Sequence, residues 1–136
     1  MTVRNWGPVR SCMREDVTYI DGLMDVRSAL QLMRDVGDTS LIVNRRDEND
    51  EYGMLLFSDI AKKVIAQNRA PARVSVHEIM AKPCLTVRPD MEIRYCARLF
   101  ENFGISHAPV VEGDEIVGMV SYYRLVLHGL LPDLED

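Results

Sequence analysis

The sequence lacks most of the features that mark secreted, membrane-spanning or metal-binding proteins. Its 136 residues contain only three cysteines, Cys12, Cys84 and Cys96, and this odd set without a CxxC pair favours a reducing compartment. No apolar run approaches the roughly 20 residues that a membrane span needs, and the first residues lack the continuous apolar segment of a secretory signal. We therefore expect a cytoplasmic protein with no membrane association.

An excess of basic charge is also absent. Sixteen Lys and Arg residues stand against 21 Asp and Glu residues, which gives a net charge of −5. A surface that binds nucleic acid needs a basic face, so we expect no nucleic-acid partner, although a local basic pocket remains compatible with this balance. The three histidines and three cysteines have no zinc-ligand spacing, and the sequence has no GxSxG, P-loop or GxGxxG motif. We therefore expect no metal, no catalytic residues and no enzymatic activity.

The sequence does contain a duplication. When it is shifted by 67 residues, six of the 31 pairs between Met13 and Val43 are identical, where about two would be expected by chance. Beyond Val43 the first copy has a loop that is two residues longer, and Gly53-Met-Leu then aligns with Gly118-Met-Val at a shift of 65. Self-similarity of this kind indicates two copies of one supersecondary unit.

Each copy reads as strand, helix, strand, strand, helix. Apolar residues follow helical spacing from Val26 to Val36 and from Ile93 to Phe103, and short apolar runs bounded by turns follow each helix. Extended segments precede the helices at residues 17–20 and 85–87, Asp25 and Asp90 are candidate N-caps, and Gly37 and Gly104 are candidate C′ residues. The final helices are expected to open at Ser58-Asp59 and near Tyr122.

The pattern predicts an α+β fold with layers of the α/β type. One half cannot cover both faces of three short strands, so we expect the two β-α-β-β-α repeats to pack sheet to sheet with pseudo-two-fold symmetry. The predicted divisions are an N-terminal arm (1–8), a first repeat (9–68), a linker (69–75), a second repeat (76–131) and an acidic tail that frays (132–136).

The ordered motifs resemble a tandem pair of CBS domains, the Bateman module. The resemblance is carried by His77-Glu-Ile-Met, Leu85-Thr-Val-Arg-Pro-Asp, Gly104-Ile-Ser-His-Ala-Pro-Val-Val, Ile116-Val-Gly-Met-Val-Ser and Gly53-Met-Leu-Leu-Phe-Ser-Asp-Ile. It covers residues 9–130 and suggests a stand-alone module. The resemblance implies a regulatory homodimer that binds AMP, ADP, ATP, S-adenosylmethionine or NAD between its repeats, requires no cofactor, and transmits occupancy to an unknown regulated protein. The alternative is a dimeric scaffold that has lost its ligand.

The family's ribose motif has a glycine, two apolar residues, Ser or Thr, two further residues and Asp. The first repeat places Asp59 at the ribose position but has Leu56 at the hydroxyl position. An ionised carboxylate accepts hydrogen bonds from ribose hydroxyls, and a helix N-terminus attracts phosphate. The alternative role for Ser58 and Asp59 is to cap the helix without a ligand. The first predicted site consists of Asp59, Ser58, Met54, Thr39, Leu85 and Val87.

The second repeat departs from the motif in the opposite way. It keeps the hydroxyl at Ser121 but has Arg124 in place of the Asp, and a guanidinium cannot accept a hydrogen bond from ribose. This second site is therefore expected to be degenerate, either empty or occupied by an anion, although Arg124 is equally compatible with a solvated side chain or an intersubunit salt bridge. The residues of the second predicted site are Ser121, Arg124, His107, Ser106 and Ile20.

Overall fold

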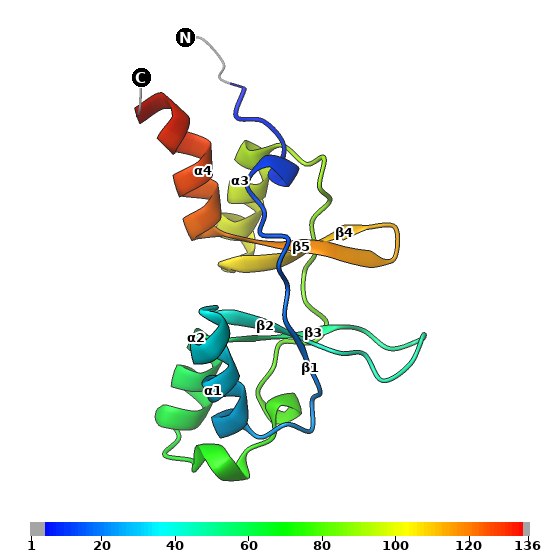
Figure 1. Cartoon of the computed structure of the whole chain (residues 1–136), viewed down its shortest axis with the longest axis vertical. Helices are drawn as coiled ribbons and strands as arrows, with labels where there is room; N and C mark the ends of the chain where they lie inside the picture. The colour runs from blue at the N-terminus through cyan, green and yellow to red at the C-terminus, as the bar shows by residue number, and fades with distance from the viewer. Residues whose placement is uncertain (1–4, 135–136) are drawn as a thin grey trace. The chain divides into compact units, whose positions relative to one another are not determined.

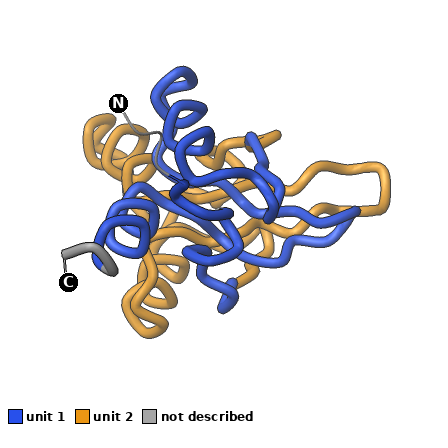
Figure 2. Tube along the Cα trace, turned by 90° about the horizontal axis from the view of Figure 1, so that it is seen from above, with its two compact units in different colours: residues 1–17, 85–136 blue, residues 18–84 orange. Residues whose placement is uncertain are grey.

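A computed structural model describes residues 5–134 of the chain, which form two compact units. Unit 1 comprises residues 1–17 and 85–136, and unit 2 comprises residues 18–84 (Figure 2). Each unit combines helices with β-strands, which confirms the predicted α+β class. Residues 1–4 of the predicted arm and residues 135–136 of the predicted tail lie outside the described residues, whereas residues 132–134 belong to the last helix.

Unit 2 is built on a three-stranded sheet. Its strands are β1 (Tyr19–Ile20), β2 (Ser40–Val43) and β3 (Gly53–Leu56), with β1 parallel and β3 antiparallel to the central β2. Helix α1 (Val26–Val36) and the short α2 (Phe57–Ile60) lie on the same face of this sheet (Figure 1), and α2 continues as the π-helical segment Ala61–Ile65. The core between sheet and helices contains Val26, Ala29, Met33, Leu41, Val43, Leu55, Ile60 and Val64.

Unit 1 repeats this plan with a two-stranded sheet. Strands β4 (His107–Glu112) and β5 (Glu115–Ser121) are antiparallel, and helices α3 (Ile93–Phe103) and α4 (Tyr122–Leu134) lie on the same side of them (Figure 1). The extended segment predicted at residues 85–87 forms no separate strand, because only Val87 pairs with β4, through a parallel bridge to Val110. The core contains Val87, Ile93, Cys96, Phe100, Ala108, Val110, Val120 and Leu125.

The helix ends follow most of the predicted signals. Asp25 is the N-cap of α1, and its carboxylate accepts a hydrogen bond of 2.9 Å from the Ser28 amide. Gly37 and Gly104 adopt left-handed conformations, with φ of 71° and 63°, at the C-terminal ends of α1 and α3. The prediction of Asp90 as the α3 N-cap is wrong: α3 begins later, so Glu92 occupies that position.

Each unit is completed by the segment that begins the other sequence repeat. The 3-10 turn η1 (Val9–Ser11) packs in unit 1, and η4 (Val76–Glu78) packs in unit 2, where it follows a further turn, η3 (Pro71–Arg73). After each of these turns the chain pairs with the last strand of its unit. Arg14 exchanges two backbone hydrogen bonds with Met119, and Ala81 exchanges two with Met54. The structural units are therefore a different division of the chain from the two sequence repeats.

Candidate ligand-binding site

The junction between β3 and α2 in unit 2 carries the predicted ribose-binding carboxylate. Helix α2 begins at Phe57, and Leu56, in an extended conformation, is its N-cap. The half-buried Asp59 accepts a hydrogen bond of 2.9 Å at Oδ2 from the Leu56 amide, which is the only hydrogen bond of its side chain among the described residues. Ser58 is exposed at the second helical position, so the prediction that it caps the helix is wrong.

The corresponding junction in unit 1, between β5 and α4, is capped by the side chain of its N-cap residue, Ser121. There the Ser121 hydroxyl accepts a hydrogen bond of 3.2 Å from the Arg124 amide, three residues later. In a complete capping box the side chain of the N-cap residue accepts from the amide of the third helical residue, and the side chain of that third residue accepts from the amide of the N-cap residue. Unit 1 keeps the first of these bonds and unit 2 keeps the second. The departures from the motif at Leu56 and Arg124 thus remove one half of the box from each unit.

Arg124 is engaged by backbone carbonyls of its own unit. Its Nε donates a hydrogen bond of 2.8 Å to the Cys12 carbonyl, and its Nη2 donates one of 3.1 Å to the Met13 carbonyl. In unit 2 the Lys63 ammonium bonds the Ile79 carbonyl, 3.0 Å away, at the position equivalent to Cys12. A cation in the first turn of a helix opposes the helix dipole, and these two carbonyl contacts offset that effect. No local sequence pattern indicates this role of Arg124, because the two carbonyls lie 112 and 111 residues away along the chain.

The loop before the middle strand meets the start of the last helix in both units. The Thr39 carbonyl accepts a hydrogen bond from the Phe57 amide, and the Ser106 carbonyl accepts one from the Tyr122 amide. Beside the second of these contacts, Ser106 Oγ lies 2.8 Å from Nδ1 of the half-buried His107. Thr39 therefore contacts the start of α2 two residues before Asp59, and Ser106 and His107 lie close to Ser121.

Comparison with known sequences identifies the family of this chain. The sequence profile of the CBS domain matches residues 9–66 and 76–129. The chain belongs to the CBS-domain family. The two repeats found by self-comparison are therefore two CBS domains in tandem, as their motifs suggested.

The CBS pair is also similar to named proteins and solved structures. It is 34% identical over 91 residues to the uncharacterized protein MK0525 of Methanopyrus kandleri, covering 65% of this chain and 45% of that one. It is 33% identical over 113 residues to homoserine O-acetyltransferase of Methanosalsum zhilinae, covering 82% of this chain and 22% of that one. The chain thus spans less than half the length of these two relatives. A hexameric CBS-CP12 protein from bloom-forming cyanobacteria superimposes with a TM-score of 0.87 at 35% identity, covering 92% of this chain and 73% of that one.

A more distant structure is that of the CBS pair of protein MJ0100 in complex with 5-methylthioadenosine and S-adenosylmethionine. It superimposes with a TM-score of 0.74 at 21% identity, covering 95% of this chain and 99% of that one. At this identity the likeness establishes the CBS-pair fold.

The remaining predicted site residues of the CBS pair divide between the two units. Met54 lies in β3 of unit 2, buried and paired with Ala81. Leu85 and Val87 belong to unit 1, where Val87 is 2% exposed and packs in the core; Ile20 belongs to unit 2 and packs in its core. The structure therefore places Asp59, Ser58 and Thr39 at one end of the unit 2 sheet, and the ligand-binding role of every predicted site residue stays a prediction.

The described residues show neither a metal cluster nor a membrane helix. Within residues 5–134, no group of three or more His, Cys, Asp or Glu side chains is placed to hold a metal ion. In the same part of the chain, no helix has the length and apolar character that crossing a membrane requires.

Proposed function

We propose that this CBS pair is a regulatory module that binds one adenosine-containing nucleotide through Asp59 and transmits its occupancy to a partner protein. The observation that carries the proposal is the state of the Asp59 carboxylate. It is half buried at the start of α2, and one oxygen is bound to the Leu56 amide. A carboxylate has about four acceptor positions, so it retains capacity for the two vicinal hydroxyls of a ribose.

The family supports the ligand class. Tandem CBS pairs are regulatory ligand-binding modules, and the MJ0100 pair was solved with two adenosine compounds. AMP, ADP, ATP, S-adenosylmethionine and NAD all present the adenosine group that Asp59 would recognise. The match to homoserine O-acetyltransferase covers only 22% of that protein, so it gives no reason to propose transferase activity. We propose a non-catalytic role that requires no cofactor.

The contrast between the units supports a stoichiometry of one adenosine ligand per chain. In unit 1 the position equivalent to Asp59 holds Arg124, whose guanidinium donates to the Cys12 and Met13 carbonyls. The side chain offers no acceptor to ribose, and withdrawing it to bind an anion would leave two carbonyls without these donors. We therefore propose that the degenerate site in unit 1 is filled by Arg124.

A second candidate function is a ligand-free interaction scaffold that acts as a homodimer or a higher oligomer. Leu56 removes one hydroxyl from the nucleotide motif, and Arg124 removes the second carboxylate. Helix α4 also exposes large apolar side chains, with Tyr123 69% and Val126 56% exposed. Exposed apolar side chains on one helix are typical of a protein–protein contact.

The test is thermal unfolding of the whole chain with AMP, ADP, ATP, NAD and S-adenosylmethionine. A ligand at 100 times its dissociation constant stabilises the protein by about 2.7 kcal/mol. Asp59→Asn is the decisive variant, because the amide oxygen can still accept from the Leu56 amide while the carboxylate charge is lost. Ser58→Ala is the matched control at an exposed neighbour.

We expect one ligand to raise the melting temperature of the wild type and of Ser58→Ala, and Asp59→Asn to abolish the shift. A panel without any shift, from a protein that sediments as a folded oligomer, would favour the scaffold. A shift that persists unchanged in Asp59→Asn would overturn the role of Asp59.

A further inference from the structure

Unit 2 contains a pocket at the end of its sheet opposite to Asp59. Its volume is about 730 Å³, within the range of small-molecule sites, and none of the predicted nucleotide-site residues of unit 2 lines it. In the β2–β3 register, Ser40 pairs with Leu56 next to Asp59, and Val43 pairs with Gly53 at the pocket. Three residues of strand separate these ends by about 10 Å.

The pocket combines an apolar wall with basic groups. Val43, Met80 and Leu23 supply the apolar side chains, and Leu23 is 77% exposed. Arg45, Arg46, His77 and Lys82 supply the basic ones. A surface of this composition suits an organic anion, whose charged group meets the basic residues and whose body covers the apolar wall.

The basic groups are only partly neutralised. Asp50 pairs with both Arg46 and Lys82, at 3.1 Å and 2.8 Å, and the Asp21 carboxylate accepts from the Leu23 amide. The Arg45 guanidinium packs over the Tyr52 ring at 5.1 Å and has no carboxylate partner among the described residues. Asp47 adds a second negative charge near Arg46, so Arg45 is the cation that is left for an anion, beside His77.

The equivalent positions in unit 1 hold an ion pair. At the shift of 67 residues, His77 corresponds to Arg10 and Arg45 corresponds to Glu112. Arg10 and Glu112 form a salt bridge of 3.1 Å. In unit 2 neither position holds a carboxylate. His77 Nδ1 lies 3.1 Å from the Gly22 carbonyl, so this contact leaves Nε2 for another partner.

We propose that the unit 2 pocket binds an organic monophosphate, with its phosphate at Arg45 and His77 and its body against Val43 and Met80. A guanidinium donates to phosphate oxygens in a planar fork, which makes Arg45 the main contact. This site is independent of the nucleotide site at Asp59. It gives the CBS pair a second input, which the equivalent position of unit 1 lacks because its own ion pair occupies it.

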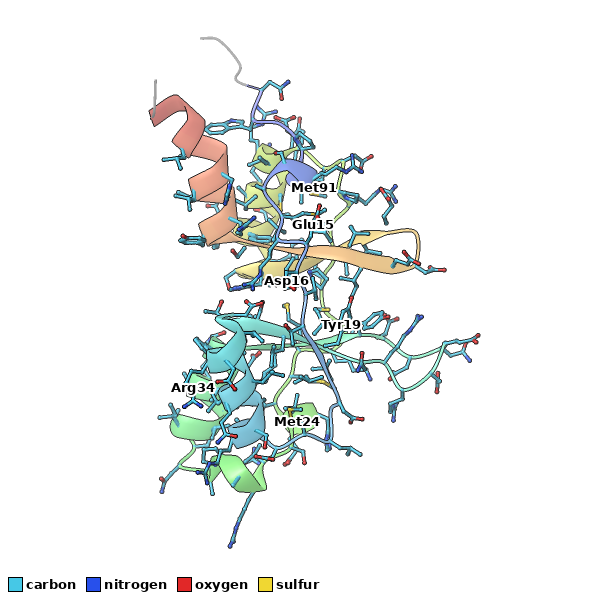
Figure 3. The ribbon with its side chains drawn as sticks, in the orientation of Figure 1. Glu15, Asp16, Tyr19, Met24, Arg34 and Met91 are labelled. Atoms are coloured by element: carbon cyan, nitrogen blue, oxygen red, sulfur yellow. The ribbon has the colours of Figure 1, made fainter. Side chains whose placement is uncertain are left out.

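The test is an NMR titration of the whole chain with phenyl phosphate, following the His77 ring proton and the Leu23 and Met80 methyl groups. Inorganic phosphate and benzyl alcohol are run as the charge-only and ring-only probes. Arg45→Glu places a carboxylate where unit 1 has Glu112. Arg34→Glu makes the same charge change on α1, where Figure 3 shows the side chain, and Asp59→Asn removes the proposed nucleotide contact.

We expect saturable shifts with phenyl phosphate, at least tenfold weaker binding in Arg45→Glu, and changes below twofold in the other two variants. Inorganic phosphate and benzyl alcohol should each bind at least tenfold more weakly. Absence of saturable shifts, equal binding by Arg45→Glu and Arg34→Glu, or equal binding of inorganic phosphate would overturn the proposal. Loss of binding only in Asp59→Asn would place the probe at the nucleotide site and also overturn it.

Discussion

The contacts of Arg124 give the sharpest prediction about stability. The variant Arg124→Met keeps an unbranched side chain as far as the position of Nε and removes both donors to the Cys12 and Met13 carbonyls. A hydrogen bond to a charged group contributes about 1.5–3 kcal/mol, and the half-buried position of Arg124 reduces this by solvent screening. We expect Arg124→Met to lower the free energy of unfolding of unit 1 by about 2 kcal/mol in total.

Amide hydrogen exchange can localise this loss. Arg14 directly follows Cys12 and Met13, whose carbonyls Arg124 binds. Its amide donates a hydrogen bond of 2.8 Å to the Met119 carbonyl, and the Met119 amide donates one of 2.8 Å to the Arg14 carbonyl. If Arg124 holds the segment against β5, a loss of 2 kcal/mol should speed exchange of these two amides about 30-fold, since 1.4 kcal/mol is a factor of ten. Urea unfolding measures the same loss globally.

The matched control is Lys63→Met in unit 2. It removes the single bond of 3.0 Å to the Ile79 carbonyl, so its expected effect is about 1 kcal/mol, with no change in exchange at Arg14 and Met119. The reasoning is refuted if Arg124→Met unfolds within about 0.5 kcal/mol of the wild type and those two amides exchange at unchanged rates. Arg124 would then be an exposed cation whose contacts contribute nothing measurable.

Three further predictions concern acid, thiols and close packing. In unit 2, hydrogen bonds lower the pKa values of Asp25, Asp50 and Glu78. The stability that these carboxylates contribute is complete above their unfolded pKa values near 4 and is lost as the pH falls. Acid should therefore unfold unit 2 before unit 1, and the fluorescence of Trp6, which packs in unit 1, should change last. Burial raises the pKa of Cys96 to about 12 and also raises that of Cys12, so a thiol reagent at pH 8 should label both only in denaturant. Gly118→Ala should lower the free energy of unfolding, measured in urea, by about 1–3 kcal/mol, because the new Cβ meets a backbone oxygen at 2.8 Å. Gly53→Ala should lower it by less, because its new Cβ meets a methionine sulfur at 2.6 Å, and a flexible side chain moves aside more easily than backbone. Simultaneous unfolding of the two units in acid would contradict the first prediction, and labelling of Cys12 or Cys96 in the native protein would contradict the second. Equal destabilisation by the two glycine variants would contradict the third.

Local patterns predicted the elements of the fold. The helical spacing of apolar residues located α1 and α3, and Asp25, Gly37 and Gly104 marked helix ends correctly, because capping and left-handed turns depend on a few neighbouring residues. The duplication predicted that both halves share one plan. The motifs then placed Asp59 at the start of α2, where the structure has it.

Local patterns failed where a contact from elsewhere decides the geometry. Ser58 is a residue type favoured at N-caps, but the Thr39 carbonyl accepts from the Phe57 amide, and the N-cap is Leu56, two residues before Ser58. The segment 85–87 alternates like a strand, yet it pairs only through Val87. Asp90 resembles an N-cap, but α3 begins three residues after it, and its carboxylate lies 3.5 Å from Arg88 Nε.

The sequence by itself determined the duplication, the order of the elements, the CBS motifs and the asymmetry between Asp59 and Arg124, since all of these are properties of residue type and spacing. Tertiary structure alone decided which segment completes each unit, what Arg124 contacts, and that Arg45 and His77 line one pocket. The physical reason is distance along the chain. Arg124 and Cys12 are 112 residues apart, and Arg10 and Glu112 are 102 apart, so no local pattern encodes these contacts; they form only when the folded backbone brings the partners together.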